Sequence, residues 1–152
     1  MRLTWLVLLA AALFAARPAA AQISVTPIRD LAFGPVIVGI PTAIGPSHPT
    51  RSGQLRLTAP VGVRVRFRFT LPNRLDGPAG ARLPIRFRTS DAIAVVSAPN
   101  SAPVTFNPRA TQILEIDNGT TINVFIGGEV DPAANQQQGD YSGTITFTVT
   151  VL

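Results

Sequence analysis

Apolar and polar residues alternate at every second position over several short stretches of the chain. Residues 61–71 are the clearest example, with valines and phenylalanines at one parity and three arginines at the other. Successive side chains of a β-strand point to opposite faces, so this pattern predicts a strand with one buried face and one solvent face. Residues 54–58, 83–88 and 141–152 repeat the alternation and predict further strands.

Shorter apolar runs between turn signals predict the remaining strands, and no long stretch has the 3.6-residue period of an amphipathic helix. These runs are residues 23–27, 30–34, 36–38, 93–96 and 104–106. Segments rich in Pro, Gly, Ser or Gln predict loops at residues 40–53, 72–82 and 131–139. A count of roughly eight to ten short strands predicts an all-β chain, an immunoglobulin-like antiparallel β-sandwich.

A turn signal at Asp117-Asn118-Gly119 predicts a β-hairpin within residues 112–126. A two-residue turn would mix polar and apolar side chains on both faces of that hairpin. A three-residue loop with positive φ at Gly119 instead places Leu114 opposite Ile122 and gives the hairpin one apolar side. We therefore expect Asn118 and Gly119 to form a bulged structural turn.

The C-terminal segment alternates threonine with aliphatic or aromatic residues and has no charge from Tyr141 to Leu152. An uncharged strand of this kind pairs readily with other chains if its edge is left free. We therefore expect it to lie inside a sheet or to be covered by a partner.

The N-terminus has the pattern of a secretory signal peptide. Arg2 precedes an apolar run of 12 residues, Trp5 to Ala16, and Ala19-Ala20-Ala21 resembles a cleavage site. This run is too short to span a bilayer as a helix, which takes about 20 residues. We expect residues 1–21 to be the signal and residues 22–152 a single exported sandwich domain without a transmembrane segment, destined for the periplasm, the outer cell surface or the medium.

The high isoelectric point, about 11.5, overstates the basicity of the chain. All 13 basic residues are arginine, so almost nothing titrates between the carboxylates and the guanidinium groups. Loss of Arg2 and Arg17 with the signal would lower the net charge from +5 to +3, an ordinary value for a small domain. The absence of cysteine excludes disulfides, thiol catalysis and thiolate metal sites.

The residues predict no catalytic, cofactor or metal site. His48 is the only histidine, and its neighbours Ser47 and Ser52 lie in the same predicted loop, which is not the arrangement of a catalytic triad. Asp131, Asn135 and Asp140 lack the dense spacing of a calcium loop, so a polar turn is the favoured interpretation.

Arginines at the polar positions of three predicted strands are the candidate binding feature. If these strands shared one sheet, six guanidinium groups would line one face and bind carboxylates or phosphates, as in an anionic polysaccharide or lipid head groups. Few aromatic residues accompany them, so we expect no nucleic acid partner. The alternative is an ordinary solvated face. The candidate residues are Arg56, Arg64, Arg66, Arg68, Arg86 and Arg88.

Two segments resemble the DUF4402 type of exported bacterial proteins. The first is Arg29-Asp30-Leu31-Ala32-Phe33-Gly34-Pro35-Val36; the second comprises Ile126 to Val130 and Gly139 to Val151. That family is similar to the spore coat U and chaperone–usher pilin proteins, which have immunoglobulin-like folds. The resemblance implies a surface fibre or coat subunit, although this chain lacks the cysteines and the long N-terminal donor extension of pilins.

We therefore expect a non-enzymatic structural or surface protein that assembles by β-strand addition, with itself or with other exported subunits. Either residues 22–26 or the C-terminal strand would pair with a neighbour's sheet edge. The alternatives are a monomeric exported binding module that uses the arginine face and, far below both, a hydrolase.

Overall fold

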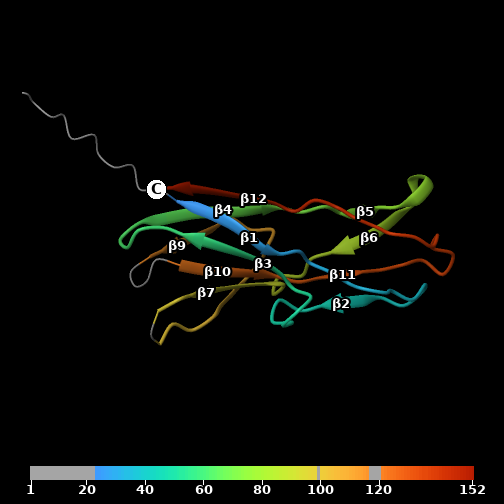
Figure 1. Cartoon of the computed structure of the whole chain (residues 1–152), viewed down its shortest axis with the longest axis horizontal. Coiled ribbons are helices and arrows are strands. Elements are labelled where there is room, and N and C mark those ends of the chain that lie inside the picture. Colours follow the sequence, from blue (N-terminus) through green and yellow to red (C-terminus); the bar gives the residue numbers. More distant parts are fainter. Residues whose placement is uncertain (1–22, 99, 117–120) are drawn as a thin grey trace, which may run out of the picture.

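The computed structural model describes residues 23–98, 100–116 and 121–152, and their strands pair antiparallel throughout (Figure 1). The only helical element among them is the short 3₁₀ turn η1 (Pro78–Gly80). The strands are β1 (Ser24–Arg29), β2 (Thr42–Ile44), β3 (Gly53–Thr58), β4 (Arg64–Thr70), β5 (Arg74–Asp76), β6 (Arg82–Arg86), β7 (Ala92–Val96), β8 (Val104–Phe106), β9 (Gln112–Glu115), β10 (Thr121–Ile126), β11 (Gly128–Val130) and β12 (Thr146–Val151).

Two sheets form the layers of a sandwich. The order β1-β3-β10-β7-β8 makes one layer and β12-β4-β9 the other, and β1 and β12 are edge strands on the same side of the molecule (Figure 1). A third sheet, β2-β11-β6-β5, extends the molecule away from the C-terminus (Figure 1). The all-β antiparallel sandwich predicted from the sequence is confirmed.

One long stretch of chain links the first and third sheets, because β10 continues into β11 after Gly127. Gly127 is buried, and its N–H donates to the Asp91 carbonyl oxygen at 2.7 Å. A Cβ at this position would lie 2.2 Å from the Ile44 carbonyl oxygen. Only glycine at position 127 therefore allows the backbone at the end of β2 to lie this close to the link between β10 and β11.

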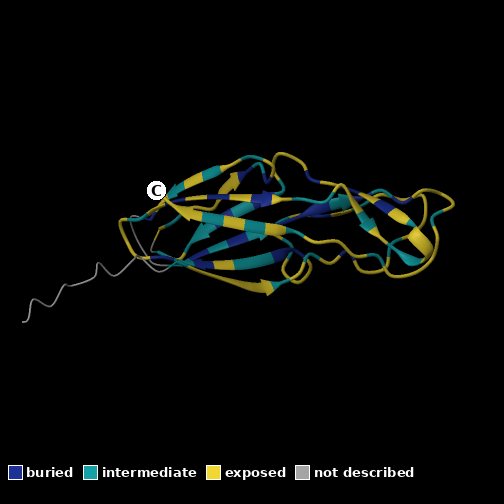
Figure 2. Ribbon diagram, turned by 90° about the horizontal axis from the view of Figure 1, so that it is seen from above, coloured by how far each residue is buried: buried dark blue, intermediate teal, exposed yellow. Residues whose placement is uncertain are grey.

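The core lies between the layers and is formed by the apolar parity of each strand. On β4, the side chains of Val65, Phe67 and Phe69 are buried and the arginines between them are exposed. Figure 2 shows the same alternation of buried and exposed positions along the strands. The Phe67 ring contacts Phe106 edge-on and Phe147 at a tilt, with centroids 5.6 and 5.4 Å apart, so it joins both layers.

The predicted hairpin of residues 112–126 is wrong. Strand β9 pairs with β4, whereas β10 pairs with β3 and β7, so the two segments belong to different layers. Ile116 and Ile122 are both fully buried, which satisfies the apolar pattern without pairing the segments to each other. The predicted turn at Asn118 and Gly119 lies outside the described residues.

Other differences concern short segments. Residues 30–34 and 36–38 form no strand, and Gly34 and Gly39 within this region adopt φ values of +69° and +72° that interrupt an extended run. Conversely, β2 and β5 lie within predicted loops, because three residues suffice for pairing where a neighbouring strand is available. The described residues contain no helix with the length and apolar character needed to cross a bilayer.

Candidate functional site

The six candidate arginines do not share a sheet. Arg56 lies on β3 in the five-stranded layer, whereas Arg86 lies at the end of β6 in the four-stranded sheet, with Arg88 just beyond it. The remaining three, on β4, belong to the three-stranded layer. The predicted single face of six guanidinium groups is therefore not formed within one chain, because alternation assigns a face on each strand but not the sheet that the strand joins.

The arginines near β6 have carboxylate partners. Arg86 Nη2 lies 3.0 Å from Asp131 Oδ2, and Arg88 Nη2 pairs with Glu129 Oε2. These pairs bridge β6 to the end of the neighbouring strand β11. Their charges are neutralised locally, so this part of the predicted face is a structural contact.

The three arginines of β4 are the candidates that remain together on one strand, whereas Arg56 lies alone on β3. Arg64, Arg66 and Arg68 are exposed on the outer side of the three-stranded sheet. Within the described residues none of the three forms an ion pair. Successive arginines of one strand face are about 6.8 Å apart, so they form a short row of positive charge.

Strand β12 lies beside this row and has one unpaired edge. It forms a regular six-pair ladder with β4, and no other strand of the described residues pairs with its second edge. The sequence predicted that this strand would lie inside a sheet or be covered by a partner. The first alternative is wrong, since β12 is an edge strand in the part of the chain that the structure describes.

The parity of the ladder shows which backbone groups of β12 are free. Facing residues of an antiparallel pair alternate between exchanging two N–H···O bonds and exchanging none. Leu152 N–H donates to the Arg64 carbonyl oxygen at 2.9 Å, so the even-numbered residues of β12 bond to β4. The backbone N–H and C=O groups that point to the outer edge are those of Phe147, Val149 and Val151.

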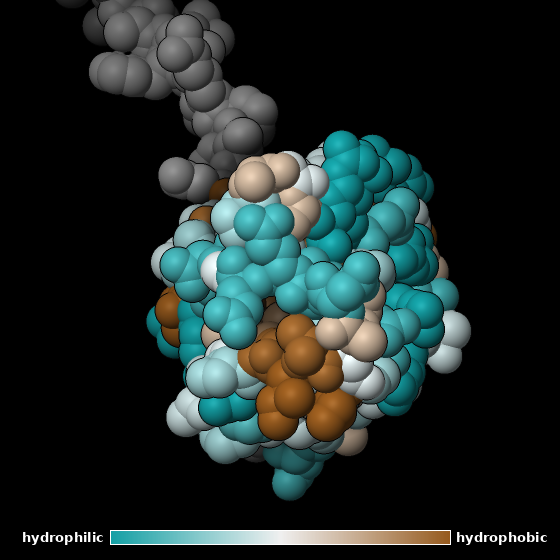
Figure 3. Space-filling model, turned by 90° about the vertical axis from the view of Figure 1, so that its right-hand side faces the viewer, coloured by the Kyte–Doolittle hydropathy of each residue, from teal (hydrophilic) through white to brown (hydrophobic). Residues whose placement is uncertain are grey.

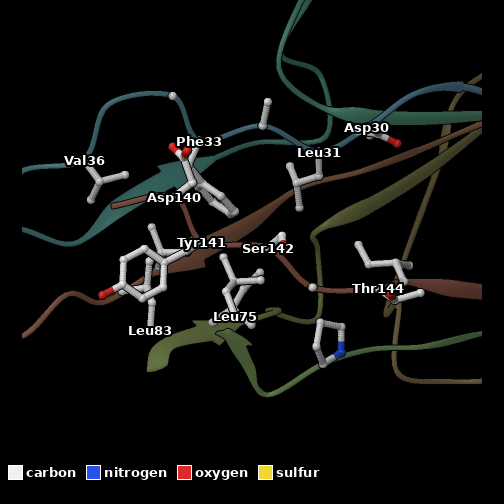
Figure 4. Close-up of a pocket in the computed structure, with 18 of the residues that line it drawn as sticks. Asp30, Leu31, Phe33, Val36, Leu75, Leu83, Asp140, Tyr141, Ser142 and Thr144 are labelled. Carbon is white, nitrogen blue, oxygen red and sulfur yellow. The ribbon is translucent and has the colours of Figure 1, made fainter. Parts of the chain in front are cut away.

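A groove lined by both apolar and polar residues continues the open side of the sandwich beyond β12. Residues 30–38 form one wall and residues 139–145 the other, with a volume of about 1170 Å³. Figure 4 shows Leu31 and Phe33 on one side and Leu75 and Leu83 on the other. The lining also includes Phe147, so the groove begins where β12 begins.

The far end of this groove carries an exposed apolar turn that the sequence pattern did not single out. Ile37, Val38 and Ile40 are 65%, 46% and 53% exposed. A hydrogen bond from Ile40 N–H to the Ile37 carbonyl oxygen closes the turn, and Gly39 N–H donates to the Pro132 carbonyl oxygen. Figure 3 shows an apolar patch at this end of the molecule. Ile37 and Val38 fall in the run 36–38, which the sequence pattern predicts as a strand, and Ile40 falls in a predicted loop. The pattern therefore gave no indication that the three side chains are exposed together.

The polar residues considered for catalysis have structural partners. His48 Nδ1 accepts hydrogen bonds from Thr50 N–H and Arg51 N–H, at 3.3 and 3.1 Å. The hydroxyl of Ser52 is fully buried and donates to the His48 carbonyl oxygen at 2.7 Å, not to the imidazole. This pair is therefore arranged as a closed turn and not as a nucleophile with its base.

The loop after β11 is also engaged in local contacts. Asp131 pairs with Arg86, and Tyr141 accepts a hydrogen bond from Gln136 Nε2 and donates to the Gln137 carbonyl oxygen at 2.7 Å. Among the described residues no three His, Asp or Glu side chains gather closely enough to hold a metal ion.

The chain belongs to the family described as "Domain of unknown function (DUF4402)", whose model matches residues 23–151. This match confirms the resemblance inferred from the two ends of the sequence. No curated protein matches the chain.

Proposed function

We propose that this protein is an exported, non-enzymatic structural subunit that assembles by β-strand addition at the outer edge of β12. The observation that carries the proposal is the row of free backbone groups at Phe147, Val149 and Val151, which follows from the ladder with β4. A strand that paired there would satisfy these donors and acceptors and extend the three-stranded sheet. Export rests on the signal-like pattern of residues 1–21.

The edge of β12 lacks the features that protect the other long edge strand. Natural edges are blunted by charge, proline, bulges or short length. Strand β1 contains Pro27 and an irregular register between Pro27 and Arg29. Strand β12 has no charge and no proline, and its six pairs are in regular register. The other edge strands of the described residues have three or four residues each.

Apolar side chains of β12 support the same site. Phe147 and Val149 are only partly buried against the core, and Val151 is 49% exposed. An added strand that alternates apolar and polar residues would cover these side chains while its backbone pairs with the edge. Burial contributes about 25 cal/mol per Å² of apolar surface, which adds to the hydrogen bonds.

The N-terminal segment is a weaker donor than the sequence suggested. Strand β1 is already paired with β3 of its own chain over five register pairs. Arg29, at the end of β1, donates three side-chain hydrogen bonds to the turn that precedes β3. The acceptors are the Pro49 and Ser52 carbonyl oxygens and Ser52 Oγ. Donation of this strand to a neighbour would require those bonds to break, so β12 is the favoured edge.

Replacement of Val149 by proline tests the proposal. The Val149 N–H points away from β4, so proline removes an outward donor without breaking the internal ladder. We expect purified wild-type protein to associate with rising concentration in sedimentation velocity, and V149P to require at least about tenfold higher concentration. Val149→Ala is the matched control, because it shortens the side chain but keeps the N–H.

Two results would overturn the proposal. One is wild-type protein that stays monomeric at hundreds of micromolar and gives a single band, unheated or boiled, in SDS electrophoresis. The other is a folded V149P that associates like wild type, since pairing at the outer edge needs the missing N–H.

A further inference from the structure

Half of the unpartnered arginines of the described residues lie on β4, whereas Arg56, Arg74 and Arg82 lie on three other strands. Arg29 and Arg51 donate to backbone carbonyl oxygens, Arg86 and Arg88 pair with carboxylates, and Arg109 lies over the Phe87 ring at 5.9 Å. Within the described residues, the three guanidinium groups of β4 form no ion pair and no side-chain hydrogen bond. They are exposed, concentrated on one strand and available to a ligand.

The surface around this row is mostly polar, with one apolar exception: Ile113 of β9 faces Arg66 and is 48% exposed. Thr148 faces Arg68 and Thr150 faces Arg66 on the β12 side. On the β9 side, Glu115 faces Arg64 and is the only carboxylate on the outer face of the three strands. The other outward residues of β12 and β4 are threonines, so no aromatic ring interrupts this surface.

Strand addition between two copies would double the row. In an antiparallel pair of β12 strands centred on Val149, Phe147 of one copy lies opposite Val151 of the other. The outward N–H and C=O groups of these residues then form hydrogen bonds between the two copies. Residues of equal parity then face each other, so both arginine rows lie on the same side of the joined sheet. Three strand spacings separate the two β4 strands, which places the rows about 14 Å apart.

We propose that this joined face binds an anionic polysaccharide along the threonine strip between the two arginine rows. The inference rests on the proposed assembly through β12. Guanidinium groups bind carboxylates and sulfates with two parallel hydrogen bonds, and threonine hydroxyls match the hydroxyl groups of sugars. Single-stranded nucleic acid is disfavoured, since its bases need aromatic side chains on which to stack.

The geometry couples binding to assembly. One chain offers a single row with Glu115 at one end, whereas the pair offers rows on both sides of the strip. A ligand that contacts both rows binds the pair more tightly than the single chain, and therefore stabilises the pair by mass action. Added polysaccharide is expected to lower the protein concentration at which association occurs.

The test measures binding of polygalacturonate and association of the protein in the same samples, with uncharged dextran as the control polymer. The triple variant R64Q/R66Q/R68Q is compared with R56Q/R74Q/R82Q, which removes the same charge from exposed arginines elsewhere. We expect the β4 variant to lose at least about tenfold in affinity and to keep its self-association. The control variant should stay within about threefold of wild type, and V149P should bind at least about tenfold more weakly.

The outcomes separate this inference from the proposed function. Normal association blocked by V149P, without polygalacturonate binding above dextran, overturns the ligand and leaves strand addition standing. Binding that survives in V149P overturns the two-row site. Oligo(dT) that binds to the same arginines as tightly as polygalacturonate overturns the polysaccharide class. Protein that stays monomeric with and without polymer overturns both proposals.

Discussion

The two long edge strands of the sandwich, β1 and β12, lie on the same side of the molecule but are built differently (Figure 1). Strand β1 contains a proline and an irregular register and is tied down by Arg29. Strand β12 is regular and uncharged, and its outer edge pairs with no strand of residues 23–98, 100–116 and 121–152. Since both segments are rich in β-forming residues, the difference shows that edge protection depends on a few residues and not on strand propensity.

The largest expected effect comes from Phe67, because its ring supports β12 and not β1. Phe67 is 1% exposed and packs against Phe147 of β12. Phe67→Ala is expected to lower the free energy of unfolding by about 3–5 kcal/mol. Hydrogen exchange should show faster opening of β12 than of β1, whose partner β3 lies in the other layer.

Phe125→Ala is the matched control for this experiment. Phe125 occupies the outward parity of β10 and is partly exposed, so its loss should cost markedly less than the loss of Phe67. Equal destabilisation by the two variants would show that the layer contacts of Phe67 do not support β12.

Arg29 is expected to have the next largest effect, because its side chain anchors the end of β1. Arg29→Ala removes hydrogen bonds of 2.7, 2.7 and 3.0 Å to the Pro49–Ser52 turn. We expect a loss of about 2 kcal/mol in the free energy of unfolding, measured by urea denaturation. Exchange of β1 amides should accelerate while that of β12 amides stays close to wild type.

Arg29→Lys tests the geometry of this anchor, because lysine keeps the charge but lacks the planar fork. It should recover less than half of the lost stability. Full recovery would show that charge alone, and not the three directed bonds, holds the end of β1.

The smallest expected effect on stability is at Pro27, but replacing this residue tests most directly why the edge of β1 is protected and the edge of β12 is not. Pro27 pairs with Leu55 in the β1–β3 ladder. Pro27→Val should change the free energy of unfolding by less than about 1 kcal/mol. In the V149P background, where the β12 edge is blocked, it should restore association in sedimentation velocity because β1 becomes a pairing edge. Protein that stays monomeric would show that the bulge protects β1 without the proline.

Local alternation allowed much of the fold to be predicted. The outward arginines and inward apolar residues of β4 follow from a period of two, which depends only on the backbone of one strand. The same reasoning located β3, β6 and β12, and it identified the uncharged C-terminal strand as a segment in need of a partner. Short apolar runs between turn signals located β1, β7 and β8.

Strand pairing could not be predicted in the same way. Asp117-Asn118-Gly119 indicated a local hairpin, but β9 and β10 pair with distant strands of opposite layers. For the same reason the six candidate arginines divided among three sheets.

The sequence by itself determined the all-β character of this protein, the buried and exposed sides of its main strands, and the absence of charge in its last strand. Only the tertiary structure decided that β12 lies at an edge, which of its backbone groups are free, and that Arg64, Arg66 and Arg68 lie beside it without ion pairs among the described residues. The physical reason is that alternation is a local property of the backbone, whereas sheet membership depends on contacts between residues far apart in the chain.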